Sequence, residues 1–192
     1  MNSQHMRFIR HISATQPILD ELDNQPELWN FYNFRTQFYP NSPHRYVSDI
    51  WLRYRDYADF NKDDPVEFGN NPDANYENWY GIAYLLPHVM QMIHNLVITE
   101  NIERLGGCLI TKIPPGKMVY PHVDKSYHAE FYKDKYLLLL QGDIQQAFCF
   151  DGEMHKGNAG DLFWFENQSE HWVENNSDIP RISLLIAARN KE

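Results

Sequence analysis

The sequence predicts a mainly β fold with flanking helices (α+β), built as an antiparallel barrel or jelly roll. From residue 105 onward, short runs rich in β-branched and aromatic residues alternate with Pro-Pro-Gly, Asp-Gly and Gly-Asn-Ala-Gly breaks. Many short strands separated by such turns are typical of β barrels and sandwiches. With 192 residues the chain needs only one hydrophobic core, so we expect a single domain over residues 1–192.

The first half of the chain has a different pattern, and we expect residues 7–102 to cover a β core that spans residues 103–190. Residues 16–29 space their isoleucine and leucines as on one face of an amphipathic helix. A second helix is predicted to begin near Pro87, because proline is tolerated in a first turn and an apolar stripe follows it. Residues 62–78 are rich in Asp, Asn and Pro and predict a long polar loop beside a functional site.

Residues 46–55 alternate between apolar or aromatic and polar positions, with Asp49, Arg53 and Arg55 on one face. This alternation predicts a half-buried strand. If the strand flanks the mouth of the barrel, an outward Arg53 is a candidate to clamp a substrate carboxylate.

The predicted strands of the second half follow the apolar runs and end at the turn residues. They are residues 108–113, 117–122, 136–141, 146–151, 161–166, 171–174 and 181–188.

The composition excludes several classes of protein. Hydrophobic residues at 43% and aromatic residues at 15% are too many for a disordered chain. A formal net charge of -9 argues against a surface for phosphate backbones, so a nucleic acid partner is not expected. No apolar stretch reaches the ~18 residues that span a bilayer, and Cys108 and Cys149 lack disulfide or metal spacing. We therefore expect a cytoplasmic protein with free thiols and no membrane association.

The triplet His122-Val123-Asp124 places an imidazole and a carboxylate two residues apart, so both side chains leave the same face of an extended segment. His171 lies on a later predicted strand and supplies a third candidate ligand. Two histidines and one carboxylate bind a divalent metal and leave coordination positions open. The open positions indicate a catalytic metal.

Arg181 follows His171 by ten residues, and Ser183 follows it by twelve. A polar turn near Asn176 predicts a hairpin in which His171 and Arg181 lie opposite each other on one face. A guanidinium pairs bidentately with a carboxylate, and a neighbouring hydroxyl adds a hydrogen bond. A carboxylate ligand beside the metal is therefore expected.

Taken in order, these motifs and the run 160–165 resemble the iron(II)/2-oxoglutarate-dependent oxygenases, and most of all their aspartyl/asparaginyl β-hydroxylase-related branch. The resemblance implies a double-stranded β-helix core, which is jelly-roll and cupin-like. It also implies Fe(II), 2-oxoglutarate and O2 as cofactors. The residues that it assigns are His122, Asp124 and His171 to iron and Arg181 with Ser183 to the distal carboxylate of 2-oxoglutarate.

One segment departs from the pattern of this branch. Members often carry a basic residue and a histidine early in the strand after the metal loop, whereas here the segment reads Lys133-Asp134-Lys135-Tyr136-Leu137. Either Lys135 or Tyr136 would supply the extra contact to 2-oxoglutarate.

The implied activity is that of a non-haem iron dioxygenase, which couples decarboxylation of 2-oxoglutarate to hydroxylation of a C–H bond. Two alternatives stay open. A cupin-like metal enzyme that does not use 2-oxoglutarate would need no arginine placed like Arg181. A non-catalytic binding module on the same fold would usually lose a metal ligand, and this chain keeps all three.

The expected substrate is a small polar molecule or a peptide, with an amino acid or a peptidyl Asp or Asn side chain as the leading interpretation. Besides Arg53, the predicted contacts are Tyr127 and His128, because they follow Asp124 in a loop that would overhang the metal. The sequence leaves the oligomeric state open.

Overall fold

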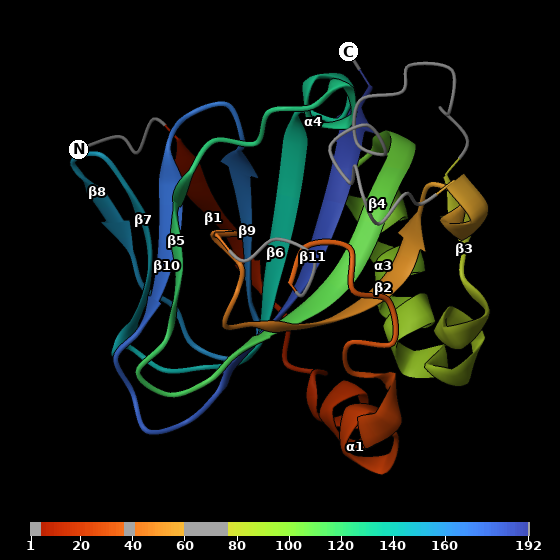
Figure 1. Ribbon diagram of the computed structural model, residues 1–192, viewed down its shortest axis with the longest axis horizontal. Helices are drawn as coiled ribbons and strands as arrows, with labels where there is room; N and C mark the ends of the chain where they lie inside the picture. The colour runs from red at the N-terminus through yellow and green to blue at the C-terminus, as the bar shows by residue number, and fades with distance from the viewer. Residues whose placement is uncertain (1–4, 37–40, 60–76, 192) are drawn as a thin grey trace.

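Two antiparallel β-sheets face each other in the computed structural model, which describes residues 5–36, 41–59 and 77–191 (Figure 1). The larger sheet has the order β1 (Met6–His11), β9 (Asp161–Glu166), β6 (Asp134–Gln141), β11 (Arg181–Asn190), β4 (Ile102–Ile113), β2 (Ser48–Tyr54) and β3 (Asn78–Trp79). The smaller sheet has the order β5 (Met118–His122), β10 (His171–Asn175), β7 (Gln146–Phe150) and β8 (Glu153–His155).

Three α-helices and three short 3-10 helices complete the described part of the chain. The α-helices are α1 (Gln16–Asn24), α3 (Pro87–Thr99) and α4 (Tyr127–Phe131). The 3-10 helices are η1 (Pro26–Leu28), η2 (Tyr57–Asp59) and η3 (Gly81–Leu85). None of these helices has the length and apolar character needed to cross a membrane.

All seven strands predicted for the second half are present, and the predicted double-stranded β-helix core is confirmed. The strands β1, β3 and β8 were not predicted. The first half does more than cover the core, since β1, β2 and β3 join the larger sheet. Of the predicted polar loop at 62–78, residues 62–76 lie outside the described residues.

The strand predicted at 46–55 is present as β2, but it is not half-buried, because it is covered on both faces. Ile50 and Leu52 are fully buried on one face, and Asp49 is only 1% exposed on the other. The pairing of β2 with β4 shifts by one residue between Trp51 and Arg53. This bulge changes which side chains beyond Trp51 face the space between the sheets.

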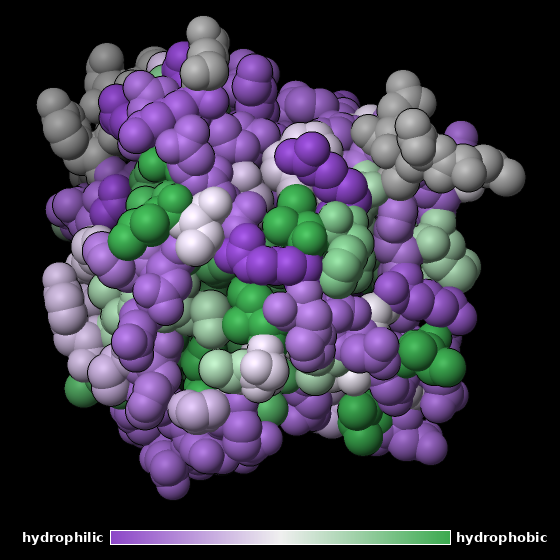
Figure 2. Space-filling view, turned by 180° about the vertical axis from the view of Figure 1, so that it is seen from behind, coloured by the Kyte–Doolittle hydropathy of each residue, from purple (hydrophilic) through white to green (hydrophobic). Residues whose placement is uncertain are grey.

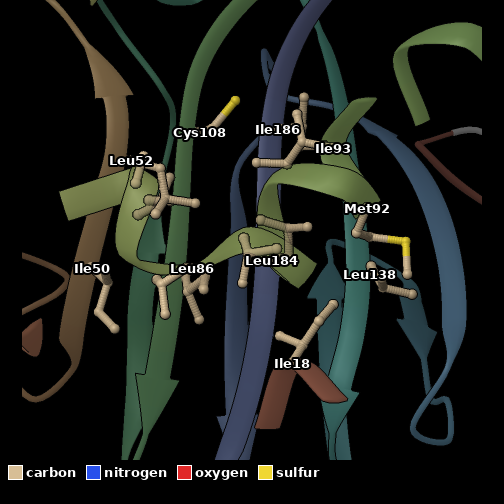
Figure 3. Close-up of a cluster of buried hydrophobic side chains, with 14 of the residues drawn as sticks. Ile18, Ile50, Leu52, Leu86, Met92, Ile93, Cys108, Leu138, Leu184 and Ile186 are labelled. Atoms are coloured by element: carbon tan, nitrogen blue, oxygen red, sulfur yellow. The ribbon is translucent and has the colours of Figure 1, made fainter. Parts of the chain in front are cut away.

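The outer face of the larger sheet forms one hydrophobic core with the helices. Figure 3 shows Met92 and Ile93 of α3 over Leu138, Leu184 and Ile186 of the sheet. Burial of a side chain of this size contributes roughly 1.5–3 kcal/mol. This core therefore holds β6 and β11 against the helices.

A second core lies between the two sheets. Phe148 and Val173 of the smaller sheet contact a cluster that includes Leu137, Phe163 and Phe165 of the larger sheet. Because side chains alternate along a strand, the residues of β11 that do not face the helices face this space. The alternation thereby directs polar residues of β11 between the sheets.

The side of the surface shown in Figure 2 is mostly hydrophilic, with hydrophobic residues among the hydrophilic ones, as is common on folded proteins. Cys108 and Cys149 are both free and buried, which confirms the expected thiols.

We expect Leu184→Ala to destabilise the protein by about 2–5 kcal/mol, because it empties a fully buried position under α3. The matched control is Ile98→Ala on α3, where the side chain is exposed and the expected change is within about 0.5 kcal/mol. Urea unfolding of the two variants measures the difference. Equal losses would contradict the described packing of α3.

Candidate active site

The three candidate metal ligands meet between the sheets. His122 ends β5, His171 begins β10, and the two residues are direct partners in the antiparallel pairing of these strands. Asp124 follows β5 by two residues. One ligand atom from each residue lies within 4.8 Å of the other two. The structure thus brings the predicted trio to one point.

Backbone carbonyls orient both imidazoles. His122 Nδ1 lies 2.8 Å from the carbonyl oxygen of Tyr120, and His171 Nδ1 lies 2.9 Å from that of Ser169. A carbonyl oxygen only accepts hydrogen bonds, so each Nδ1 carries the proton and each Nε2 keeps a free lone pair. This is the arrangement in which a histidine binds a metal through Nε2.

The charges of the trio also suit a divalent cation. Burial, helped by the neighbouring His171, lowers the pKa of His122 to about 4, so this imidazole is neutral at pH 7. Burial alone would raise the pKa of Asp124, but the Lys135 ammonium and the two imidazoles offset this effect and hold the pKa below its usual value. His122 and Asp124 therefore offer a nitrogen lone pair and a carboxylate without needing to lose a proton.

Arg181 lies in the same pocket as the trio, on the inner face of β11. It is 3% exposed, and burial lowers the pKa of its guanidinium to about 10, which leaves it charged. It forms no ion pair with any residue that the structure describes. A buried guanidinium without an acidic partner is costly unless a ligand supplies the negative charge.

Two hydroxyls stand next to this guanidinium. Ser183 of β11 is paired with Thr111 of β4, and both side chains line the pocket. Their hydroxyl oxygens are buried, and neither has a hydrogen-bond partner among the described residues. Arg181, Ser183 and Thr111 together form a set of donors suited to a carboxylate. Thr111 was missed in the sequence, because its place depends on the register between β4 and β11.

The predicted hairpin between His171 and Arg181 was wrong. β10 lies between β5 and β7, whereas β11 lies between β6 and β4 in the other sheet. The connection crosses from one sheet to the other, and the side-chain amide of Asn175 donates hydrogen bonds to the carbonyls of Ile113 and Ile179, both at 2.9 Å. His171 and Arg181 therefore line one pocket from two sheets, not from one hairpin.

The structure separates the two alternatives for the extra basic contact. Lys135 lines the pocket, and its Nζ lies 3.9 Å from Oδ2 of Asp124. Tyr136 points to the other face of β6, into the core under the helices, where its hydroxyl is hydrogen-bonded to Asn190. Successive residues of a strand face opposite sides, so the prediction of Tyr136 as a pocket residue was wrong.

His128 lines the pocket from α4, and Ser126 caps this helix by accepting a hydrogen bond from the backbone N–H of Ala129. The Nε2 atom of His128 lies 3.0 Å from the buried carboxylate of Glu77. Burial lowers the pKa of His128 despite this carboxylate. The adjacent Tyr127 is not among the pocket residues, and its ring stacks on Phe131 of the same helix.

Arg53 does not reach the pocket. Its guanidinium lies over the ring of Trp79 and donates a hydrogen bond to the carbonyl of Leu105, beside a separate surface hollow. The bulge in β2 explains this difference from the prediction, because Trp51 and Tyr54 line the pocket while Arg53 turns away. The prediction of Arg53 as a substrate contact is therefore wrong for the pocket that contains the metal ligands.

Two further pocket residues were missed in the sequence. Arg35 lines the pocket from the irregular segment before β2, and His44 places its ring 4.7 Å from that of His122. Neither residue belongs to a regular element, so no periodicity or spacing in the sequence predicts its position.

The pocket has a volume of about 320 Å³, within the range of small-molecule sites. Its walls are largely apolar and include Leu109, Leu137, Phe148 and Phe165. The polar groups converge from both sheets on a space large enough for a small ligand beside a metal.

The structure thus combines a double-stranded β-helix with a candidate metal site of two histidines and one carboxylate between its sheets. The family model described as aspartyl/asparaginyl beta-hydroxylase matches residues 75–191, more than half of the chain. The chain therefore belongs to the aspartyl/asparaginyl β-hydroxylase family, and the resemblance drawn from its sequence is confirmed.

Solved structures share the fold at low sequence identity. A prolyl-4-hydroxylase from Pseudomonas putida is 17% identical with a TM-score of 0.53, and the match covers 98% of this chain and 95% of that one. A prolyl hydroxylase from Trichoplax adhaerens, in complex with a hypoxia inducible factor oxygen degradation domain peptide fragment, is 12% identical with a TM-score of 0.58. That match covers 98% of this chain and 85% of the other. No curated protein matches the sequence at a significant level.

We expect divalent metal ions to stabilise the folded chain through the trio. A metal at 100 times its dissociation constant adds about 2.7 kcal/mol to the free energy of unfolding. His171→Ala removes one ligand and should abolish most of this gain, whereas His94→Ala on the exposed face of α3 should retain it. Thermal unfolding with and without Mn(II) measures the gain. An equal gain in both variants would contradict the assignment of the site.

Proposed function

We propose that this protein is an Fe(II)/2-oxoglutarate-dependent dioxygenase that hydroxylates a C–H bond of a small polar substrate, an amino acid or a peptidyl Asp or Asn side chain. The observation that carries the proposal is the buried Arg181, which has no ion-pair partner in the described part of the chain and lies in the same pocket as His122, Asp124 and His171. A metal site alone fits many enzymes, whereas a buried guanidinium beside it calls for an anionic co-substrate.

The trio would hold the iron. His122 and His171 present Nε2 lone pairs because their Nδ1 protons are held by backbone carbonyls, and Asp124 supplies the charge. This ligand set leaves three coordination positions open on an octahedral ion. Bound iron and 2-oxoglutarate would supply the oxidising chemistry, in which O2 is consumed, 2-oxoglutarate is converted to succinate and CO2, and one oxygen atom goes to the substrate.

The inner end of the pocket would hold the distal carboxylate of 2-oxoglutarate. Arg181 donates through its planar fork, and the unpaired hydroxyls of Ser183 and Thr111 complete the donor set. Lys135 is the remaining candidate for the extra contact to the co-substrate, since it is the member of the Lys135–Tyr136 pair that faces the pocket. Its ammonium also keeps Asp124 ionised for the metal.

The pocket walls would protect the reaction from water. Leu137, Phe148 and Phe165 line the pocket beside the polar groups, and all three side chains are buried. Exclusion of water strengthens the ionic interactions inside the site and suppresses side reactions.

The two alternatives make different demands on the pocket. A cupin-like enzyme that does not use 2-oxoglutarate would leave Arg181, Ser183 and Thr111 without a ligand, at the cost of several buried polar groups. A binding module without catalysis would have no need for a complete trio. The site therefore favours the oxygenase over both alternatives.

Anaerobic titration with Fe(II) and 2-oxoglutarate tests the proposed function directly. We expect a visible absorption band that requires both additions, because 2-oxoglutarate chelates the metal when it binds. In air, the protein should then consume 2-oxoglutarate and form succinate. Turnover of a substrate without any keto acid would favour the cupin-like alternative.

We expect Arg181→Met to raise the KM for 2-oxoglutarate by about 30-fold or more, because loss of a buried charged pair typically costs ~2–5 kcal/mol. Arg181→Lys keeps the charge but loses the two-pronged geometry, so its effect should be smaller. Ser183→Ala and Thr111→Val each remove one hydrogen bond, worth ~1 kcal/mol or about fivefold.

The matched control is Arg189→Met, which removes a half-exposed arginine from the same strand. Its KM for 2-oxoglutarate should stay within twofold of the wild-type value. An unchanged KM in Arg181→Met would remove 2-oxoglutarate from the inner end of the pocket.

A further inference from the structure

Arg35 presents a second guanidinium to the pocket, and Asp49 holds it in place. Its Nε lies 2.7 Å from Oδ2 of Asp49 and its Nη2 lies 3.0 Å from Oδ1. The Asp49 side chain is 1% exposed, whereas that of Arg35 is 23% exposed. The carboxylate is thus buried behind the guanidinium, and the guanidinium faces the pocket.

The position of Asp49 is itself fixed by the backbone. Its N–H donates to the side-chain oxygen of Asn30 at 3.0 Å, its carbonyl accepts from the backbone N–H of Asn30 at 2.7 Å, and it is paired with Thr111 of β4. The Arg35 guanidinium also lies 5.7 Å from the centre of the Trp51 ring. An arginine held this firmly loses little entropy when it binds a ligand.

The ion pair leaves part of the guanidinium unused. Asp49 accepts from Nε and Nη2, so the N–H groups of Nη1 have no partner among the described residues. A guanidinium has five N–H donors, and one edge is enough to bind a second carboxylate. A purely structural ion pair would not require Arg35 to line the cavity that contains the metal ligands.

Arg35 and Arg181 belong to different parts of this cavity. Asp49, which holds Arg35, lies on β2, two strands away from Arg181 on β11, a separation of about 10 Å between strand axes. Arg35 lines the same cavity as His44, whose ring centre lies 4.7 Å from that of the metal ligand His122. An anion at Arg35 would therefore lie beside the metal but apart from the donor set of Arg181.

The charges that line the cavity favour a second anion. Besides Arg35 and Arg181, the lining includes Lys125 and Lys135, and its only carboxylate among the described residues is that of Asp124. The two carboxylates of 2-oxoglutarate offset the +2 charge of a divalent metal, so the four basic side chains still exceed the carboxylates of Asp124 and Asp49 in charge. The net positive charge of the cavity therefore favours the binding of another carboxylate.

We propose that Arg35, held by Asp49, binds a carboxylate of the primary substrate, so that the substrate is a small carboxylic acid or an acidic peptide side chain. This inference rests on the proposed function, because the metal site defines where the reacting carbon lies. Arg35 is then the residue that selects an anionic substrate, and the carboxylate anchors the molecule with a C–H bond near the metal. The shared chemistry is the carboxylate, whether it is the α-carboxylate of a free amino acid or the side chain of a peptidyl aspartate.

Equilibrium binding to protein loaded with Zn(II) and 2-oxoglutarate tests this inference without turnover. The probes are the twenty L-amino acids, their C-terminal amides, and blocked peptides that carry either Asp or Asn. We expect at least one carboxylate probe to bind and its amide counterpart to bind at least 30-fold more weakly. Preference for free amino acids identifies the α-carboxylate as the anchor, and preference for Asp over Asn in blocked peptides identifies the side chain.

The variants separate Arg35 from the rest of the site. Arg35→Lys keeps the ion pair with Asp49 but loses the fork, and the double variant Arg35→Met/Asp49→Asn leaves no charge unpaired. Each should weaken binding of the carboxylate probe about 30-fold or more and leave the Kd for 2-oxoglutarate within twofold. The control Arg45→Met removes a surface arginine that stacks on Tyr120, and it should change neither constant.

Two results would overturn the inference. One is that no carboxylate probe binds better than its amide although 2-oxoglutarate binds normally. The other is that both Arg35 variants retain the affinity of the wild type for the carboxylate probe. If 2-oxoglutarate itself failed to bind the wild-type protein, the proposed function would fail, which is a separate outcome of the same titrations.

Discussion

The register between β5 and β10 is the constraint on which the rest of the site depends. It pairs His171 directly with His122, and the centres of the two rings lie 4.4 Å apart. Because side chains alternate along a strand, a shift of one residue would turn an imidazole away from the space between the sheets. β10 is hydrogen-bonded to β7 on its other side, so two neighbours fix this register. The geometry of the candidate metal ligands thus follows from backbone pairing in the smaller sheet.

The larger sheet supplies what the smaller sheet lacks, which is buried positive charge. Arg181 and Lys135 both face the space between the sheets, and each is buried enough that its pKa falls. Asp124, beside the smaller sheet, partly balances Lys135, but no described residue balances Arg181. An unpaired buried charge costs several kcal/mol. A bound anion would remove this cost, so ligand binding and the packing of the two sheets are energetically linked.

The sequence predicted the elements of the fold better than their partners in space. The spacing of His122 and Asp124 placed both on one face because that spacing depends only on the alternation along one extended segment. The prediction of a hairpin between His171 and Arg181 was wrong because the sequence does not show that the turn crosses from one sheet to the other. The prediction for Arg53 was wrong because a single-residue bulge in β2 changes the direction of the side chains that follow it. Arg35 has no local signal, since its position depends on a buried ion pair with a residue of β2.

These differences share a physical cause, which is how firmly strand pairing and core packing fix the position of each residue. The residues predicted correctly lie on or next to strands of the two sheets, where pairing and core packing allow little variation. Arg35 lies on an irregular segment tied to the sheet by Asp49, where the chain tolerates change more readily. If Arg35 binds the substrate as proposed, a substitution in this segment would alter which substrate fits without moving His122, His171 or Arg181. Under the proposed function, the metal and co-substrate contacts would come from the regular strands and their ends, and the choice of substrate from the segment that packs beside them.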